Sequence, residues 1–398
     1  MDAQHPRSAC AAIDAAALHH NLERLRARLH ARTRLLAVVK ADGYGHGALL
    51  VARELASGGV DAFGVATAGE GAELRAAGLR QPVLVLAGAR GPDLRIAAEH
   101  DLSVALLDGE HLREIESLRL PRPLRVHVKV DTGMGRLGTD VDALPGLLSE
   151  VEQAHNVVVE GVFSHFGNAE SVDNEFCREQ LRRFRQAVEL VKRRWPASTA
   201  HLANSVATWS NPETHFDMVR PGLLLYGVRP NSAVEVPEVR PVMSLTAPVL
   251  QVRELPEGRA VSYGQTYVTR RRTRLAVLGV GYADGYDRRL SNVGRVVLRG
   301  RAAAVVGRIC MDVTLVDVTE IPEVSVGDRA LLWGAALPVE EVAACAGTIS
   351  YELLTRLSRR VPRYLHEEQQ VESPTQRDTG RSVTVPMRGG RWQRSSER

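Results

Sequence analysis

Eight short apolar runs recur at intervals through residues 34–222, and this repetition restricts the fold more than any other feature of the chain. Each run is bounded by turn residues, which is typical of a buried strand. The runs cover residues 34–40, 62–68, 82–88, 102–108, 124–130, 157–166, 199–205 and 216–222.

Segments with the helical spacing of apolar and charged residues separate these runs. The longest covers 177–195, and Asp173 could serve as its N-cap. Strands that alternate with helices predict an α/β fold, and eight such strands predict a (β/α)8 barrel of the TIM type. A doubly wound open sheet is the alternative, but no GxGxxG motif follows the first strand to support it.

The pattern changes after Gly227, where a Pro-rich connection leads into strand-like segments without long helices between them. This change predicts a mostly β C-terminal domain. Its expected strands are 244–255, 260–268, 274–281, 295–307, 312–318 and 328–334, with helices at 338–347 and 351–359.

Four parts of the chain follow from these patterns. Residues 12–235 would form the barrel, and residues 236–366 would form the β domain. Residues 1–11 are an N-terminal segment that could join the β domain. Residues 367–398 are polar and aperiodic, so we expect a disordered tail there.

Composition and charge exclude several classes of function. The net charge of +4 is small for 398 residues, and no basic stripe interleaved with aromatic residues predicts a nucleic-acid partner. No apolar stretch approaches the ~20 residues that span a bilayer, and the first residues do not resemble a signal peptide. The four cysteines are scattered without metal-ligand spacing, so we expect reduced thiols, no metal site and a cytoplasmic location.

Lysine is rare in this chain. Only Lys40, Lys129 and Lys192 occur, against 48 arginines. An amine can lose its proton, act as a base and form a Schiff base, whereas a guanidinium stays protonated. Lys192 lies in an Arg-rich run and is expected on the surface. Lys40 and Lys129 both end apolar runs; either could be a strand-end lysine that reaches water, but the pair favours chemistry.

Reactive side chains gather at the ends of the expected strands. In a (β/α)8 barrel the active site forms at the carboxyl ends of the strands, and the loops after the last two strands commonly bind phosphate. A lysine there, together with serine and glycine after those last strands, fits pyridoxal phosphate (PLP), which has an aldehyde and a phosphate. The residues at these positions are Lys40, Lys129, Asp131, Arg136, His165, Asn204, Ser205, Arg220 and Gly222.

At these same positions the chain resembles the alanine racemases, which are fold-type III PLP enzymes. The matching segments occur in order over about residues 34–363, and they include AVVKADGYGHG, KVDTGMGRLG, HLANS, VRPGLLLYG, VSYGQTY and GRICMDVTLVDV. Two departures are Gly167 after SHF, where alanine is more familiar, and the tail beyond Arg363.

The resemblance implies a role for each matching residue. Lys40 would hold PLP covalently and act as base for one enantiomer, and Tyr263 would be the base for the other. Arg220 would donate to the pyridine nitrogen, with His165 beside the ring. The remaining cofactor contacts, most of them to the phosphate, would come from Tyr44, Asn204, Ser205, Gly222, Leu223 and Tyr351.

Other implied roles concern the substrate. Arg136 and the Met311 backbone would receive its carboxylate, Lys129 would be carbamylated and orient Arg136, and Tyr282 and Asp312 would line the entrance. Each residue has a simpler alternative. The tyrosines could be half-buried aromatics of a β domain, His165 a core histidine, and Arg136 a loop cap.

The implied function is racemisation of L- and D-alanine by a homodimer with composite sites, supplying D-alanine for bacterial peptidoglycan. Two alternatives stay open. One is a related racemase for serine or several amino acids. The other is a non-catalytic PLP-binding barrel protein, although such proteins lack a second β domain.

Overall fold

The computed structural model describes residues 9–168, 174–230 and 238–366. Eight parallel strands form a closed ring, because β5 pairs with both β4 and β6 while the remaining strands connect them in the order β4-β3-β2-β10-β9-β8-β6. The predicted barrel is confirmed, and the open-sheet alternative is wrong. The strands are β2 (Arg34–Val38), β3 (Ala62–Val65), β4 (Val83–Val85), β5 (Ser103–Leu106), β6 (Leu124–Asp131), β8 (Val157–Phe163), β9 (Thr199–His201) and β10 (Met218–Val219).

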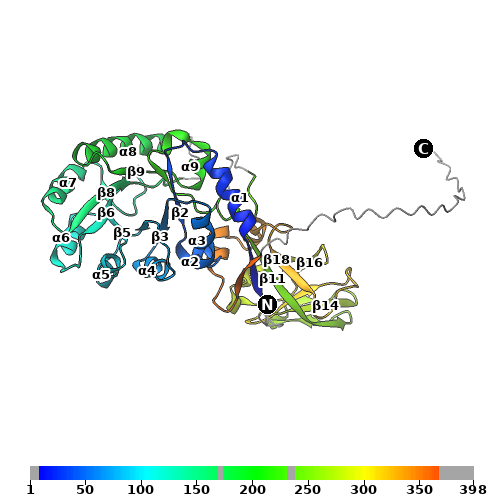
Figure 1. The fold of residues 1–398 in the computed structure, drawn as a ribbon. Coiled ribbons are helices and arrows are strands. Elements are labelled where there is room, and N and C mark those ends of the chain that lie inside the picture. Colours follow the sequence, from blue (N-terminus) through cyan, green and yellow to red (C-terminus); the bar gives the residue numbers. More distant parts are fainter. Residues whose placement is uncertain (1–8, 169–173, 231–237, 367–398) are drawn as a thin grey trace, which may run out of the picture. The chain divides into compact units, whose positions relative to one another are not determined.

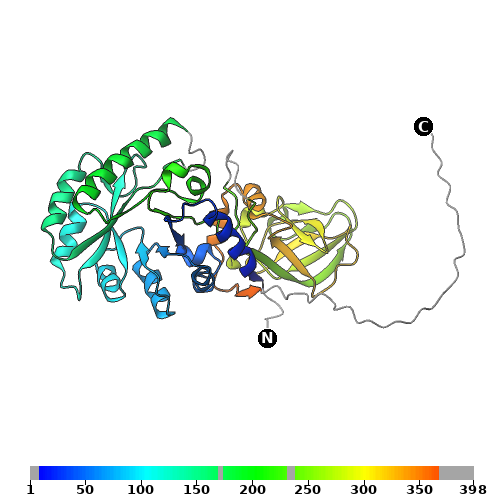
Figure 2. The ribbon, with the colours of Figure 1, turned by 45° about the horizontal axis from the view of Figure 1, so that its top comes forward.

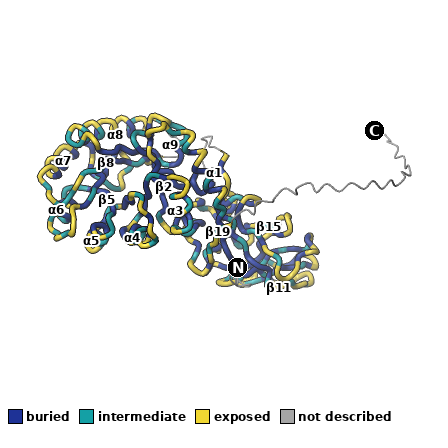
Figure 3. Tube along the Cα trace, viewed as in Figure 1, coloured by how far each residue is buried: buried dark blue, intermediate teal, exposed yellow. Residues whose placement is uncertain are grey.

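Helices lie along the outside of the strand ring (Figures 1 and 2). Except for the short helix at 205–210, which has no exposed residue, each buries one apolar stripe and exposes the opposite face, which is the expected pattern for a surface helix. Figure 3 shows this alternation along the trace. The helices are α1 (Ala15–Arg26), α3 (Ala48–Ser57), α4 (Ala68–Ala76), α5 (Pro92–Glu99), α6 (Gly109–Ser117), α7 (Leu144–Gln153), α8 (Glu175–Arg194) and α9 (Ser205–Ser210). No helix in the described ranges is long and apolar enough to cross a membrane.

The N-cap of α8 is Asn174, whose side chain accepts a hydrogen bond from the Cys177 backbone N–H at 2.8 Å. The expected cap, Asp173, lies outside the described residues. Both side chains suit the position, because a short polar group can satisfy the free N–H groups of the first turn.

Residues 243–366 are mostly β, and one strand from the start of the chain joins their sheet. The sheet order is β16-β15-β18-β11-β1-β19, and β14 pairs with β11 and β17. The strands are β1 (Cys10–Asp14), β11 (Met243–Leu255), β14 (Thr273–Leu278), β15 (Arg295–Leu298), β16 (Arg301–Ala304), β17 (Thr314–Asp317), β18 (Arg329–Trp333) and β19 (Arg363–His366). Because β1 pairs with β11 and β19, we propose that residues 9–11, the described part of the N-terminal segment, belong to this β domain.

Three expected elements differ in the structure. The segment 295–307 is a hairpin of β15 and β16, because positive φ angles at Arg299 (48°) and Gly300 (73°) turn the chain between them. The segment 260–268 is not one strand but a hairpin of β12 (Ala260–Val261) and β13 (Tyr267–Val268) around a 3-10 turn, η2 (Tyr263–Gln265). Positive φ angles at Ser262 and Gln265, 65° and 53°, break the extended conformation there. The helix expected at 351–359 is shorter, α11 (Ser350–Thr355), and it follows α10 (Val339–Cys345). The tail expected at 367–398 lies outside the described residues.

A left-handed turn follows β2 and carries the sequence that begins at Lys40. Five consecutive residues have positive φ, namely Ala41 (52°), Asp42 (55°), Gly43 (62°), Tyr44 (53°) and Gly45 (78°). A left-handed residue other than glycine costs roughly 1–2 kcal/mol. Surrounding contacts must therefore stabilise this turn.

Three contacts from distant parts of the chain hold the turn. The Glu70 carboxylate, at the start of α4, accepts a hydrogen bond from the Ala41 N–H at 2.7 Å. The Arg363 guanidinium donates from Nε to the Gly45 carbonyl at 3.0 Å. Gly45 itself packs so closely against α11 that a Cβ there would lie 2.0 Å from the Leu354 carbonyl oxygen.

We predict that Gly45→Ala destabilises the protein far more than Gly59→Ala. Both glycines have positive φ, 78° and 82°, but no atom lies within 4 Å of a Cβ built on Gly59. Gly59→Ala should therefore cost only the left-handed conformation, about 1–2 kcal/mol. Gly45→Ala must also displace the Leu354 backbone, so urea unfolding should show a loss at least about twice as large. Equal losses of unfolding free energy in the two variants would mean that close packing against α11 does not stabilise the turn.

Candidate functional site

A cavity of about 720 Å³ opens at the carboxyl ends of the barrel strands. Residues of α10 and α11 also line it. Most of the predicted site residues share this cavity, namely Lys40, Tyr44, Lys129, Arg136, His165, Asn204, Ser205, Arg220, Gly222, Leu223 and Tyr351. Tyr263, Tyr282, Met311 and Asp312 do not line it.

The lining of the cavity is strongly cationic. Among the described residues it contains two lysines, three arginines and a single carboxylate, that of Glu340. Such a wall attracts anionic ligands. The five cations are Lys40, Lys129, Arg136, Arg220 and Arg229.

Lys40 follows the carboxyl end of β2, and its side chain lines the cavity there. Burial lowers the pKa of its amine, and the positive charge of Arg136 lowers it further. A larger neutral fraction makes an amine a better nucleophile and base. The scarcity of lysine predicted a reactive amine here, and its role stays a prediction.

Lys129 is a second amine of unusual character. It is only 5% exposed, and its Nζ lies 5.2 Å from the centroid of the Phe163 ring. Burial, followed by the charge of Arg220, lowers its pKa to about 7. The amine is therefore neutral in an appreciable fraction of molecules near neutral pH.

Arg220 is buried and held by four contacts. Its Nη2 donates to the carbonyls of Ser164 at 2.6 Å and Leu202 at 3.0 Å, and to His165 Nδ1 at 3.2 Å. Its Nη1 donates to His201 Nδ1 at 2.9 Å. Within the described residues its Nε–H has no acceptor and can serve a ligand in the cavity.

The contact with Arg220 also fixes the state of His165. A guanidinium has donors only, so His165 Nδ1 must accept and the ring carries its proton on Nε2. Burial lowers the pKa of His165 well below its ordinary value, and the charge of Arg220 acts in the same direction. The ring is therefore a neutral donor at the cavity wall.

Ser205, Gly222 and Tyr44 form a narrow corner of the cavity. The Gly222 N–H donates to Ser205 Oγ at 2.9 Å, which turns the hydroxyl proton of Ser205 outward as a donor. A Cβ on residue 222 would lie 2.6 Å from the Tyr44 hydroxyl, so only glycine leaves this corner open. Two hydroxyls around a glycine backbone fit a phosphate group. Tyr351 packs against Tyr44 with ring centroids 5.8 Å apart, and Asn204 caps α9 by accepting from the Ala207 N–H at 3.1 Å.

The loop that carries Arg136 winds around the carboxylate of Asp131. Its two oxygens accept hydrogen bonds from the N–H groups of Gly133 and Met134, both at 2.8 Å, and of Arg136, at 2.9 Å. Three backbone bonds to one anion define the loop conformation. The sequence placed Asp131 at the strand end but did not reveal this anchoring role.

Gln180 is a site-supporting residue that the sequence analysis missed. It is 1% exposed on α8, and its amide donates to the His165 carbonyl at 3.2 Å and accepts from the Gly167 N–H at 2.9 Å. It thereby joins the loop after β8 to the helix. An amide within the apolar stripe of a helix was the available signal, because buried polar groups there need partners.

The other predicted residues gather on loops of the β domain. Tyr263 is 71% exposed, Met311 53% and Tyr282 43%. The N–H of Tyr282 donates to the Cys310 carbonyl at 3.0 Å, which places Tyr282 and Met311 on adjacent loops. Asp312 accepts from Arg360 at 2.8 Å. Exposed aromatic side chains of this kind suit a contact with another surface.

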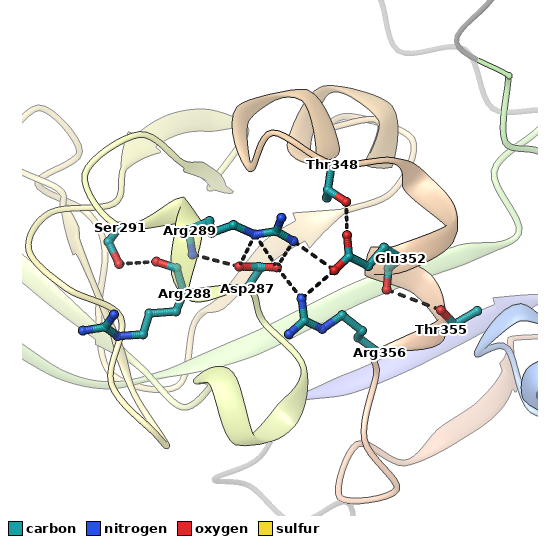
Figure 4. A network of polar contacts seen from close by, with 8 residues as sticks. All are labelled: Asp287, Arg288, Arg289, Ser291, Thr348, Glu352, Thr355 and Arg356. Carbon is teal, nitrogen blue, oxygen red and sulfur yellow. Dashed lines mark hydrogen bonds and ion pairs between the residues drawn. The ribbon is translucent and has the colours of Figure 1, made fainter.

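An ion-pair network fixes α11, the helix that bears Tyr351 (Figure 4). Asp287 accepts from Arg289 at 2.7 Å and from Arg356 at 2.9 Å. Glu352 accepts from the same two arginines, at 3.2 and 2.9 Å, and from Thr348. The loop at η4 (Arg288–Leu290) is thus tied to the cavity wall.

Comparisons with known proteins agree over nearly the whole described chain. The sequence model for "Alanine racemase, N-terminal domain" matches residues 13–230, and that for "Alanine racemase, C-terminal domain" matches residues 242–365. The alanine racemase of Desulfovibrio desulfuricans is 41% identical over 362 residues, which cover 90% of this chain and 98% of the relative. That of Syntrophobacter fumaroxidans is 40% identical over 354 residues, 87% of this chain and 94% of the relative.

Solved structures of alanine racemases superpose closely on this fold. That of E. faecalis has a TM-score of 0.85 at 33% identity and covers 92% of this chain and 100% of its own. That of Bartonella henselae, with covalently bound pyridoxal phosphate, has a TM-score of 0.82 at 31% identity and covers 90% of this chain and 99% of its own.

We predict that Asp287→Asn destabilises the protein more than Glu179→Gln. Each carboxylate serves two arginines, but the Asp287 side chain is 4% exposed and that of Glu179 is 39% exposed. Removing the buried anion should cost about 1–3 kcal/mol in urea unfolding, whereas water screens the exposed cluster.

The stabilisation by Asp287 should also depend on pH. Hydrogen bonds from Arg289 hold the pKa of Asp287 below its ordinary value of 3.8. Its stabilisation is therefore present above that pH and lost as the pH falls through the lowered pKa. The difference in the free energy of unfolding between wild type and Asp287→Asn should therefore become smaller in acid. A difference that is constant down to the acid transition would contradict this assignment.

Proposed function

Because this chain belongs to the alanine racemase family, we propose that it is a PLP-dependent enzyme that interconverts L- and D-alanine. One observation carries the proposal: a cavity with a desolvated lysine, Lys40, and four further cations at the mouth of the barrel. This wall suits an aldehyde together with two anionic groups, a phosphate and a substrate carboxylate. The product would supply D-alanine for bacterial peptidoglycan, in a cytoplasm that keeps the four free cysteines reduced.

The residues at the site fit PLP part by part. Lys40 would bind its aldehyde, and the free Nε–H of Arg220 would face its ring nitrogen, with His165 beside the ring. The corner formed by Tyr44, Ser205 and Gly222 would hold the phosphate, with support from Asn204, Leu223 and Tyr351. When bound, PLP supplies an electron sink that makes the α-proton of an attached amino acid removable.

The chain's own residues would bind the substrate and move its proton. The guanidinium of Arg136 and the backbone of Met311 would hold the carboxylate, since a fork of donors matches its two oxygens. Lys40 would take or return the α-proton on one face, helped by its lowered pKa. Tyr263 would do the same on the opposite face, because inversion needs a base on each side.

Tyr263 would reach this site from a second copy of the chain. Within one chain it does not line the cavity, and its side chain is 71% exposed on the β domain. A two-fold dimer presents the same surface twice. It would place Tyr263 and Met311 of each subunit at the partner's cavity, with Tyr282 and Asp312 at the entrance.

Mixing two inactive variants tests the shared site. Lys40→Ala and Tyr263→Phe homodimers should each be nearly inactive. In a mixed dimer one site carries both lesions and the other carries none. Co-refolding should therefore restore roughly a quarter of wild-type activity if pairing is random and the sites are independent. Absence of any recovery would mean that both bases belong to one chain.

The reaction itself is tested with purified protein, PLP and a panel of L-amino acids. L-alanine should be converted until the two enantiomers are equal, because their free energies in water are the same. Chiral chromatography measures this directly. Faster turnover of L-serine or several other amino acids would favour a broader racemase. Absence of D-alanine would favour a non-catalytic PLP carrier, which the exposed Tyr263 and the second domain speak against.

We further propose that the Lys129 amine carries a carbamate, formed from the neutral amine and CO2 with release of a proton. The resulting anion would lie near the cations Arg136 and Arg220, whose charges both act on this amine. The pKa of about 7 means that the reactive neutral form increases from pH 6 to pH 8.

Carbon-13 bicarbonate provides the measurement. A carbamate signal should appear in the spectrum of the wild type, grow over this pH range, and vanish in Lys129→Met. Lys192, which is paired with Asp217 at 2.7 Å, is the internal control because its amine remains in both proteins. A signal that survives Lys129→Met would remove the modification from residue 129.

A further inference from the structure

A chain of polar side chains crosses the interior of the barrel behind Arg220. Arg220 Nη1 lies 2.9 Å from His201 Nδ1, and His201 Nε2 lies 2.8 Å from His127 Nδ1. His127 Nε2 then lies 3.8 Å from a carboxylate oxygen of Glu160, an ion-pair distance rather than a hydrogen bond. The chain thus leads from the cavity at one end of the strands toward their amino ends.

Its two ends differ in environment. Arg220 is 4% exposed, His201 0% and His127 7%. The Glu160 side chain is 37% exposed and is also bound by Ser103 Oγ at 2.7 Å and Arg125 at 3.1 Å. Within the described residues Arg220 has no carboxylate in hydrogen-bond contact, so these histidines are the link between its charge and an acidic group.

In this series of side chains each hydrogen bond can be donated in only one direction, from Arg220 toward Glu160. A guanidinium cannot accept, so His201 Nδ1 must accept and a neutral His201 carries its proton on Nε2. That proton is donated to His127 Nδ1, which must also accept. His127 therefore carries its proton on Nε2, facing Glu160. Protonating either ring would place two N–H groups against each other.

The surroundings reinforce the neutral state of both rings. The ring of Phe163 stacks on His201 with centroids 4.9 Å apart and planes 1° apart. Burial lowers the pKa of His127 to about 3 and that of His201 well below its ordinary value. The charged or titratable groups that act on the two rings from neighbouring elements are Arg34, Arg125, Lys129, Glu160 and Arg220.

We propose that His201 is a positioning residue for Arg220 and that His127 links it toward Glu160, so that the side chains form a relay with a single direction of hydrogen-bond donation. The relay fixes the tautomer of each ring, holds the Arg220 guanidinium at one rotation, and keeps both imidazole rings uncharged. Its effect on turnover rests on the proposed function, in which Arg220 faces the cofactor ring. The relay itself does not depend on that role.

His201 makes two contacts in the relay, one arm to Arg220 and one arm to His127, and two substitutions at residue 201 separate them. His201→Asn puts an amide oxygen near the place of Nδ1, so the acceptor for Arg220 is kept. His201→Gln puts the amide near the place of Nε2, so the arm to His127 is kept and the acceptor for Arg220 is lost. These two variants are a matched pair, because both replace the ring by a neutral amide.

The variants should differ in kcat and in the spectrum of the bound cofactor. We expect His201→Asn to stay within about threefold of wild type, and His201→Gln to lose at least about tenfold in kcat. KM should change little, since Arg136 holds the carboxylate. The visible absorption of bound PLP and its pH dependence should shift only in His201→Gln. Equal losses in both variants, or an unchanged spectrum in His201→Gln, would overturn the positioning role.

Nitrogen-15 NMR of the histidine-labelled holoenzyme tests the relay without turnover. Signals are assigned by their loss in His127→Asn and His201→Asn. Both rings should show the neutral tautomer with its proton on Nε2, unchanged between pH 5 and pH 9. A ring that titrates in this range, or that carries its proton on Nδ1, would overturn the relay. Failure of the wild type to racemise alanine would instead refute the proposed function and leave this result standing.

Discussion

The left-handed turn from Ala41 to Gly45 is the constraint on which the cavity depends. It directs Lys40 into the barrel mouth and brings Tyr44 against the backbone of Gly222, where a Cβ would lie 2.6 Å from the Tyr44 hydroxyl. Three of its residues are not glycine, so the turn is intrinsically unfavourable. The Glu70 carboxylate accepts a hydrogen bond from the Ala41 N–H and Arg363 donates one to the Gly45 carbonyl, so two residues of different domains stabilise the turn. The β domain therefore supports the lysine as well as supplying the exposed tyrosine.

Five cationic side chains line the cavity, but burial reduces the charge that its two lysines carry. Burial lowers the pKa of Lys40 and Lys129, so that both amines can exist in the neutral form. Arg220 keeps its charge but passes its hydrogen bonds to neutral histidines and carbonyls. A site of this kind can bind anions while keeping an amine reactive, which is the combination that the proposed reaction needs.

The barrel and the location of the site could be predicted from the sequence, because buried strands and their polar ends leave a local pattern. The left-handed turn could not, since Ala41 and Tyr44 have no preference for positive φ. The relay through His127 and His201 was also hidden. The two residues are 74 positions apart and meet only because β6 and β9 share the barrel interior. Tyr263 was identified by resemblance, whereas its segment was wrongly expected to be one strand.

Reduction of the holoenzyme with borohydride tests the central claim most directly, because it fixes a cofactor to the amine that holds it. Peptide mapping should then find the pyridoxyl group on the peptide that contains Lys40, at the start of the left-handed turn. The chain offers only two other lysines for comparison, Lys129 in the same cavity and Lys192 on the surface. A label on either of them would contradict the account.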